Sequence, residues 1–80
     1  MRNPKAVASA CRLLGGNVRQ LRVALGLTQT TAAQRAGIYW RHWQKIEYGT
    51  VNVTLSTLVG IAYALETTIV ALFAERRAAS

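Results

Sequence analysis

Side chains that could carry out covalent or metal chemistry are few in this sequence, and they are scattered. The chain has one histidine, His42, one cysteine, Cys11, and three acidic residues, all of them glutamates. These residues cannot supply a carboxylate pair, a nucleophilic triad or a three-ligand metal site. The pair Gly15-Gly16 also lacks the later glycines or the lysine of a phosphate-binding loop. We therefore expect no enzymatic activity, no cofactor and no metal.

The charge balance indicates a polyanionic partner instead. Ten lysines and arginines stand against the three glutamates, which gives a formal net charge of +7 and a pI near 10.9. Nucleic acid is favoured over an acidic membrane surface, because the basic residues are spread along the chain and do not line one face of an amphipathic helix.

Length and apolar content limit the architecture. Eighty residues with 51% hydrophobic content suffice for one small domain with a single core. Apolar runs are broken well before the roughly 20 residues that a membrane span requires, and the N-terminus lacks an export signal. Cys11 has no second cysteine with which to form an internal disulfide, which fits a reducing compartment. We expect a cytoplasmic protein with no membrane partner.

Residues 37–49, GIYWRHWQKIEYG, gather both tryptophans, two of the three tyrosines and the histidine. At about 100° per residue, Trp43 and Ile46 point to one side of a helix. Arg41 and Lys45 must point to the other, because burying them without nearby acids would be costly. The stretch is therefore two-sided. Its outward side comprises Arg41, Gln44, Lys45 and Tyr48.

Helical periodicity recurs along the chain and strand alternation is nearly absent, so we expect an all-α fold. Asn3 and Pro4 should begin a short leading helix that Gly15-Gly16 interrupts. Thr28 and Thr54 should cap later helices, and either Thr67 or Thr68 the last one. The expected segments are an extra N-terminal helix at 4–14 and then five helices at 17–25, 29–36, 39–48, 55–65 and 68–77.

This order divides the chain into an N-terminal extension at 1–15, a domain at 16–74 and a basic tail at 75–80. Within the domain, a short helix, a turn at Gly37-Ile38 and a polar-faced helix form the helix-turn-helix arrangement. Ala33 is small enough for the two helices to approach closely. In this arrangement the second helix enters the DNA major groove.

Residues 17–73 resemble the helix-turn-helix domain of the phage-repressor and Cro family, the Xre-type regulators. The resemblance rests on motifs that occur here together and in the family's register: NVRQLRVALGLTQ, AAQRAGI, QKIEYGTVNVTLSTL and IAYALETTIVALF. It implies a cytoplasmic, bacterial or phage-encoded transcription regulator, associated with the nucleoid through its operator. The helix at 39–48 would be the recognition helix.

The resemblance also implies roles for single residues. Gln29 would bond a DNA phosphate and steady the recognition helix, and Arg22 and Glu47 would form a structural ion pair. Judged by residue type, Trp40 has two equally weighted roles, contact with DNA or a lip of the core. Arg19 is expected in solvent, with phosphate contact as the less favoured alternative. Positions that meet DNA in the family correspond to Tyr39, Trp40, Arg41, Gln44 and Lys45, with Thr50 and Asn52 near the DNA backbone.

Four positions depart from the family pattern and carry structural expectations. Ala32 and Ala36 replace larger aliphatic residues, and Trp43 replaces the usual Ile or Val of the recognition helix. Because cores keep a nearly constant packing density, we expect a buried Trp43 to compensate for the two small residues. Glu66 replaces a common glycine at a helix end, so that turn is expected to differ.

One such helix contacts only a few base pairs, so we expect a homodimer on a palindromic operator. The last helix is the first candidate for the interface, with the leading helix as the second. The alternative is that the apolar residues of the last helix close the monomer core instead. The predicted interface residues are Ile69, Val70 and Phe73, with Leu72 equally suited to the core.

Two classes of function are compatible with this sequence. The first is a sequence-specific, double-stranded-DNA-binding regulator, such as a phage repressor, a restriction-modification controller or a self-repressing antitoxin. With no room for a sensing domain, its control would depend on its own concentration. The second is a protein-interaction module, such as an antitoxin whose main partner is a toxin, with DNA binding secondary.

Overall fold

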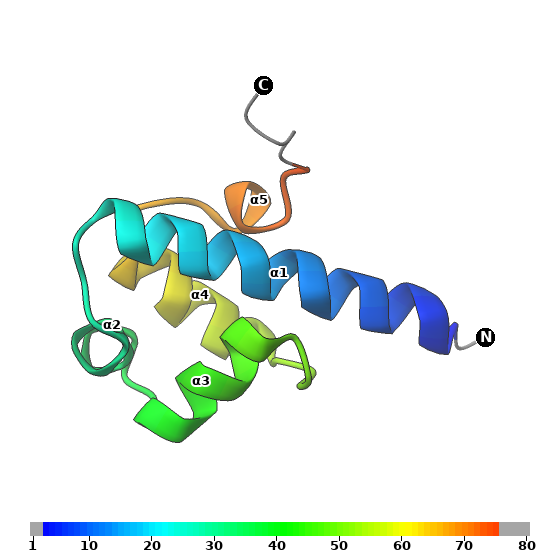
Figure 1. Ribbon diagram of the computed structural model, residues 1–80, viewed down its shortest axis with the longest axis horizontal. Helices are drawn as coiled ribbons and strands as arrows, with labels where there is room; N and C mark the ends of the chain where they lie inside the picture. The colour runs from blue at the N-terminus through cyan, green and yellow to red at the C-terminus, as the bar shows by residue number, and fades with distance from the viewer. Residues whose placement is uncertain (1–2, 76–80) are drawn as a thin grey trace.

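The computed structural model describes residues 3–75, and this part of the chain is helical with no strand. The prediction of an all-α, five-helix fold is confirmed. Figure 1 shows the long first helix crossing the molecule, with its N-terminal turns extending past the other helices. The helices are α1 (Pro4–Ala24), α2 (Gln29–Ala36), α3 (Trp40–Tyr48), α4 (Leu55–Ala64) and α5 (Ile69–Leu72).

One hydrophobic core joins the helices. α1 packs on α3 and α5, and α2 packs on α3 and α4. Trp43 is the largest of the fully buried side chains, as expected from its replacement of a smaller residue. Ala32 and Ala33 are buried in the same cluster, so small and large side chains together fill the core. The other core members are Leu14, Val18, Ile46, Ile61, Ala62, Ala64, Leu65 and Leu72.

Side-chain oxygens cap the helix starts that the sequence predicts. Thr28 Oγ1 accepts a hydrogen bond from the backbone amide of Thr31 at 3.0 Å, and Thr54 caps α4 in the same way. Of the two candidates for α5, Thr68 is the cap and Thr67 is not. These starts are predictable because a cap bonds an amide only three residues further along the chain.

The predicted break at Gly15-Gly16 is wrong, because α1 runs without interruption for 21 residues. A Cβ atom on Gly15 would lie 2.5 Å from the Ile46 carbonyl oxygen and 2.7 Å from that of Glu47. Gly15 therefore allows α1 and α3 to come into backbone contact. The expected N-terminal helix is the first part of α1, and the division between residues 15 and 16 falls inside α1.

Asn17 is the other surprise in α1, because it is buried and does not start a helix. Its side-chain amide donates to the carbonyl oxygens of Leu72 at 2.9 Å and Ala74 at 2.7 Å. Those acceptors would bond later amides if α5 continued. α5 therefore ends at Leu72, and the predicted helix over 68–77 is too long. Residues 76–80 of the predicted basic tail lie outside the described residues.

The apolar residues of α5 divide between core and surface. Leu72 is fully buried, and Ile69 and Phe73 pack partly buried against the core. Only Val70 is largely exposed, at 82%. In α4, the helical spacing of Leu55, Leu58, Ile61, Ala62 and Leu65 predicts one buried apolar stripe. Leu55 is instead 68% exposed, so this prediction is wrong for that residue. The outward face of α4 consequently carries more apolar surface than the sequence pattern indicated.

The turn after α4 keeps the conformation that glycine adopts elsewhere in this fold. Gly37 ends α2 with φ 73°, and the Ile38 amide bonds the Ala33 carbonyl at 3.1 Å. Glu66 has φ 56°, and the following amide bonds the Ala62 carbonyl at 2.9 Å. The expectation that this turn differs is therefore wrong, and Glu66 adopts a left-handed conformation that is unfavourable for it.

Candidate nucleic-acid interface

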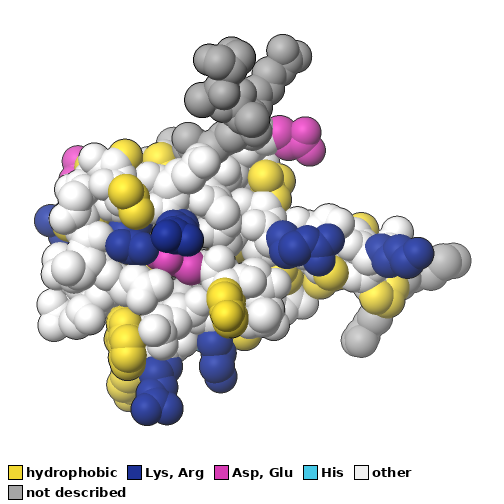
Figure 2. Space-filling view, in the orientation of Figure 1, with side chains coloured by type: hydrophobic (Ala, Val, Ile, Leu, Met, Phe, Trp, Pro, Cys, Tyr) yellow, Lys and Arg dark blue, Asp and Glu magenta, His cyan; other side chains and the backbone are white. Residues whose placement is uncertain are grey.

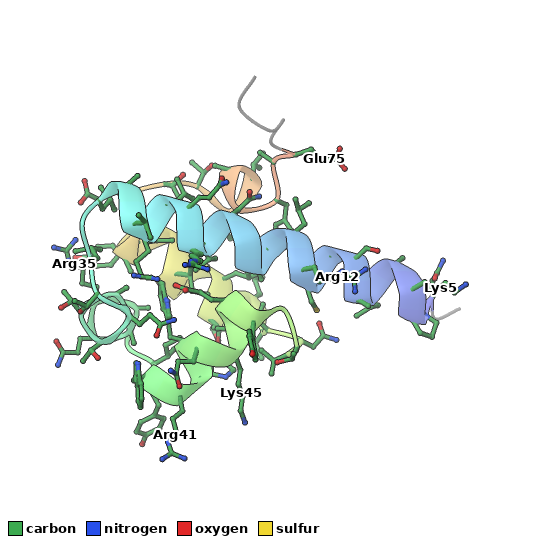
Figure 3. The ribbon with its side chains drawn as sticks, viewed as in Figure 1. Lys5, Arg12, Arg35, Arg41, Lys45 and Glu75 are labelled. Carbon is green, nitrogen blue, oxygen red and sulfur yellow. The ribbon has the colours of Figure 1, made fainter. Side chains whose placement is uncertain are left out.

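The surface of α3 is divided into a buried face and an exposed face. Trp43 and Ile46 have 0% and 1% of their surface exposed, while Arg41 and Lys45 lie in solvent. Figure 3 shows both basic side chains extending away from the molecule, on the side of α3 opposite α1. Gln44 and Tyr48 are exposed as well.

Glu47 anchors the orientation of this helix. Its carboxylate accepts hydrogen bonds from Arg22 Nε at 2.6 Å and Nη2 at 3.1 Å. Gln29 Nε2 donates to it at 3.0 Å, and Trp43 Nε1 donates at 2.5 Å. Arg22 also donates to the Leu27 carbonyl at 2.9 Å. One carboxylate thus ties α1, α2 and α3 together, so the outward face of α3 is held rigidly.

The environment of Glu47 keeps its carboxylate charged. Burial raises the pKa of Glu47, but the hydrogen bonds from Arg22, Trp43 and Gln29, together with the positive charge of Arg22, outweigh burial. The pKa of Glu47 is therefore lower than its ordinary value of 4.5. At neutral pH the ion pair is fully formed.

The N-terminal end of α3 presents aromatic surface beside the basic residues. Tyr39 is 88% exposed and Trp40 is 44% exposed. Trp40 therefore offers half its surface to a partner while the rest is covered by the protein. The residues around this end form a surface depression lined by Tyr39, Trp40, Arg41, His42 and Lys45.

The other predicted residues flank α3 on its two sides. Thr50 and Asn52 are exposed in the loop between α3 and α4, and Thr50 Oγ1 donates to the Lys45 carbonyl at 3.3 Å. Gln29 is half-buried at the start of α2, with its amide nitrogen on Glu47. The structure also brings Arg19 to this surface, although the sequence favoured solvent over phosphate contact for this residue. The depression there is lined by Arg19, Arg22, Gln29, Gln44, Lys45, Glu47 and Tyr48.

The positive charge of this surface is not neutralised within residues 3–75. Glu47 pairs with Arg22, and exposed Glu66 lies 3.6 Å from Arg35. Neither of these ion pairs includes Arg41 or Lys45. Figure 2 shows basic side chains and apolar side chains projecting together from the edge that α3 forms. Such a surface suits DNA, whose phosphates are negatively charged and whose major groove exposes the apolar methyl groups of thymine.

Other kinds of site find no support in the described part of the chain. Residues 3–75 contain no group of three or more His, Cys, Asp or Glu side chains that could hold a metal ion. Among the helices described, none is long and apolar enough to cross a membrane.

A short helix, a left-handed turn at Gly37 and a second helix with an exposed polar face define a helix-turn-helix unit. The sequence matches the family model described as "Helix-turn-helix domain" over residues 13–75. The chain therefore belongs to the helix-turn-helix family of DNA-binding proteins, in its Xre-type, phage-repressor and Cro-like branch.

Solved structures agree with this assignment. The restriction-modification controller protein C.AhdI from Aeromonas hydrophila is 32% identical, with a TM-score of 0.78 over 81% of this chain and 98% of that protein. An HTH_3 family transcriptional regulator from Vibrio cholerae is 28% identical, with a TM-score of 0.79 over 84% of this chain and 38% of that one. The clp gene regulator ClgR from Corynebacterium glutamicum, 21% identical over 79% of this chain and 67% of its own, shares the fold with a TM-score of 0.75. No curated protein matches the chain in a sequence comparison.

Proposed function

We propose that this protein is a sequence-specific transcription regulator that places α3 in the major groove of DNA. The observation that carries the proposal is the two-sided α3. Its inner face is fixed in the core by Trp43 and Ile46, while Arg41 and Lys45 extend into solvent without an acidic partner in the described residues. A helix held in this way presents its polar side chains to base edges at little cost in conformational entropy.

The outward side chains have distinct roles in this proposal. Arg41 forms a bidentate pair with a guanine, and Gln44 hydrogen-bonds an adjacent base edge. Lys45 contacts a phosphate or a base, and Gln29 together with Thr50 and Asn52 fixes the helix on the DNA backbone. Tyr39 and Trp40 provide apolar contact, for which a thymine methyl group is the matching feature.

A single α3 contacts few base pairs, so the functional unit in our proposal is a homodimer on a palindromic operator. Two recognition helices related by a two-fold axis would contact half-sites about 10 base pairs, or a multiple of this, apart. Two matching structures, at 32% and 28% identity, are described as a restriction-modification controller and a transcriptional regulator, which supports a regulatory function.

The test is a mobility-shift titration of the DNA upstream of the gene with wild type, Arg41→Ala and Lys45→Ala. We expect Arg41→Ala to weaken specific binding by about 1–3 kcal/mol, because a bidentate base contact is lost. If Lys45 contacts a phosphate, Lys45→Ala lowers the slope of log affinity against log salt by about 0.9.

Lys5→Ala is the matched control, because Lys5 is exposed on the extending end of α1 and carries the same charge. It should bind specific DNA like the wild type. Equal binding by all four proteins would mean that α3 is not the recognition surface. It would favour the interpretation as a protein-interaction module.

A further inference from the structure

The exposed face of α4 is apolar along its whole length. Leu55, Val59 and Tyr63 are 68%, 54% and 78% exposed, and their spacing of four residues aligns them in one stripe. The only other exposed residue of α4 is Ser56. The opposite face of α4 is already buried against α2 and the core. α4 therefore has two apolar faces, of which the fold covers one.

The outer face of α4 also carries no charge. The whole chain has a net charge of +7, and two copies repel each other wherever basic surfaces meet. α4, from Leu55 to Ala64, contains no acidic and no basic residue. Its outer face is thus a place where two copies can approach without bringing like charges together.

We propose that this stripe is the interface between two copies of the chain, with a two-fold axis at Val59. Leu55 and Tyr63 lie equally far from Val59 along the helix, on either side. In an antiparallel pair of α4 helices, Val59 faces Val59 of the second copy, and Leu55 faces Tyr63. Each large aromatic ring then covers the aliphatic side chain opposite it. The inference rests on the homodimer in the proposed function.

The structure favours α4 over the interface predicted from the sequence. Of the three residues expected there, Ile69 and Phe73 pack against the monomer core, and only Val70 is largely exposed. One exposed valine on a helix of four residues offers little apolar area. The α4 stripe offers three large side chains on a helix of ten residues.

Cysteine cross-linking tests the two-fold axis directly. The experiment uses full-length protein with Cys11→Ala as background and mild oxidation at tens of micromolar. Val59→Cys should form a covalent dimer, because a residue on the two-fold axis faces its own copy, and a disulfide requires Cα atoms about 4–7 Å apart. Leu55→Cys and Tyr63→Cys alone should not, since copies of either lie roughly 12 Å apart along antiparallel helices. Mixing these two variants should restore cross-linking.

Val23→Cys and Val70→Cys are matched controls, because both residues are exposed valines, at 58% and 82%, outside α4. Faster cross-linking at either control position than at Val59 would overturn the proposal. The proposal would also be overturned if Val59→Cys sediments as a dimer but does not cross-link. Val59→Lys, with a helical circular dichroism spectrum like that of the wild type, should sediment as a monomer, and an unchanged dimer would also contradict the interface.

The same proteins separate this inference from the proposed function. Val59→Lys keeps Arg41 and Lys45, so it should still bind a single half-site in a salt-dependent way while losing tight binding to the full operator. If Val59→Cys cross-links but neither it nor the wild type shifts DNA, the regulator is contradicted and the interface stands. If the protein binds DNA as a dimer but Val59→Cys does not cross-link, the α4 interface is contradicted and the regulator stands.

Discussion

Glu47 is an acidic residue in a basic helix, and its role is structural. It is one of three acids in the chain, and its carboxylate accepts four hydrogen bonds from three side chains. Trp43 contributes one of these bonds, so the residue that fills the core also positions the carboxylate. Because Arg22 and Gln29 belong to α1 and α2, Glu47 fixes α3 against both helices.

The state of Glu47 links stability to pH. Its pKa is lowered in the folded protein, so the folded state binds its proton less readily than the unfolded state does. The stabilisation is fully present above the ordinary value of 4.5 and is lost as pH falls below it. We expect urea midpoints of the wild type to fall steeply in that acidic window.

Glu47→Gln is the variant that isolates this effect. The glutamine side chain has no negative charge, and its NH2 group would face the N–H groups of Arg22, Gln29 and Trp43, which also donate. We therefore expect a loss of about 2–4 kcal/mol in the free energy of unfolding at pH 7. Its stability should also depend less on pH below 4.5, the ordinary pKa. A variant with the acid sensitivity of the wild type would show that other carboxyl groups cause it.

Trp43 combines packing with a hydrogen bond, and two substitutions separate these contributions. Trp43→Ala should lower the free energy of unfolding by about 3–5 kcal/mol, since it opens a cavity in the core. Trp43→Phe keeps most of the ring volume but loses the indole donor to Glu47, so a smaller loss of about 1–2 kcal/mol is expected. Equal losses in equilibrium denaturation would mean that packing of the indole has little importance.

Between elements, the backbone contact of α1 with α3 depends on a glycine that looks like a helix breaker. Gly15 and Gly16 are neighbours in α1, but only Gly15 faces the backbone of α3. Gly15→Ala should destabilise the protein by about 1–3 kcal/mol, because its methyl group would clash with the α3 carbonyls. Gly16→Ala has open space around it and should stabilise α1 by about 0.5–1 kcal/mol. Thermal unfolding of the two variants should therefore shift in opposite directions.

Helix ends that depend on local hydrogen bonds could be predicted from the sequence, whereas contacts between distant segments could not. Thr28 and Gly37 mark the ends of α2 through bonds to residues a few positions away, so their pattern was sufficient. Gly15 and Asn17 depend on α3 and on the segment after α5, which no local pattern brings near. The two faces of α3 follow from periodicity, whereas the exposure of Leu55 and the partial burial of Phe73 depend on how α4 and α5 dock.

The whole molecule has two surfaces of opposite character. The α3 edge is basic and carries exposed aromatic residues, while the outer face of α4 is apolar and uncharged. In our account the first surface binds DNA and the second binds another copy of the chain. Because one face binds a polyanion and the other avoids charge, raising the salt concentration should weaken DNA binding far more than dimer formation.

Selection of bound sequences from a random DNA pool tests the central claim most directly. The wild type should enrich two symmetric half-sites about 10 base pairs, or a multiple of this, apart. Arg41→Ala should lose the preference for guanine at one position in each half-site and keep the remaining positions. Enrichment of no sequence by the wild type, or of an identical motif by the wild type and Arg41→Ala, would contradict recognition of DNA by α3.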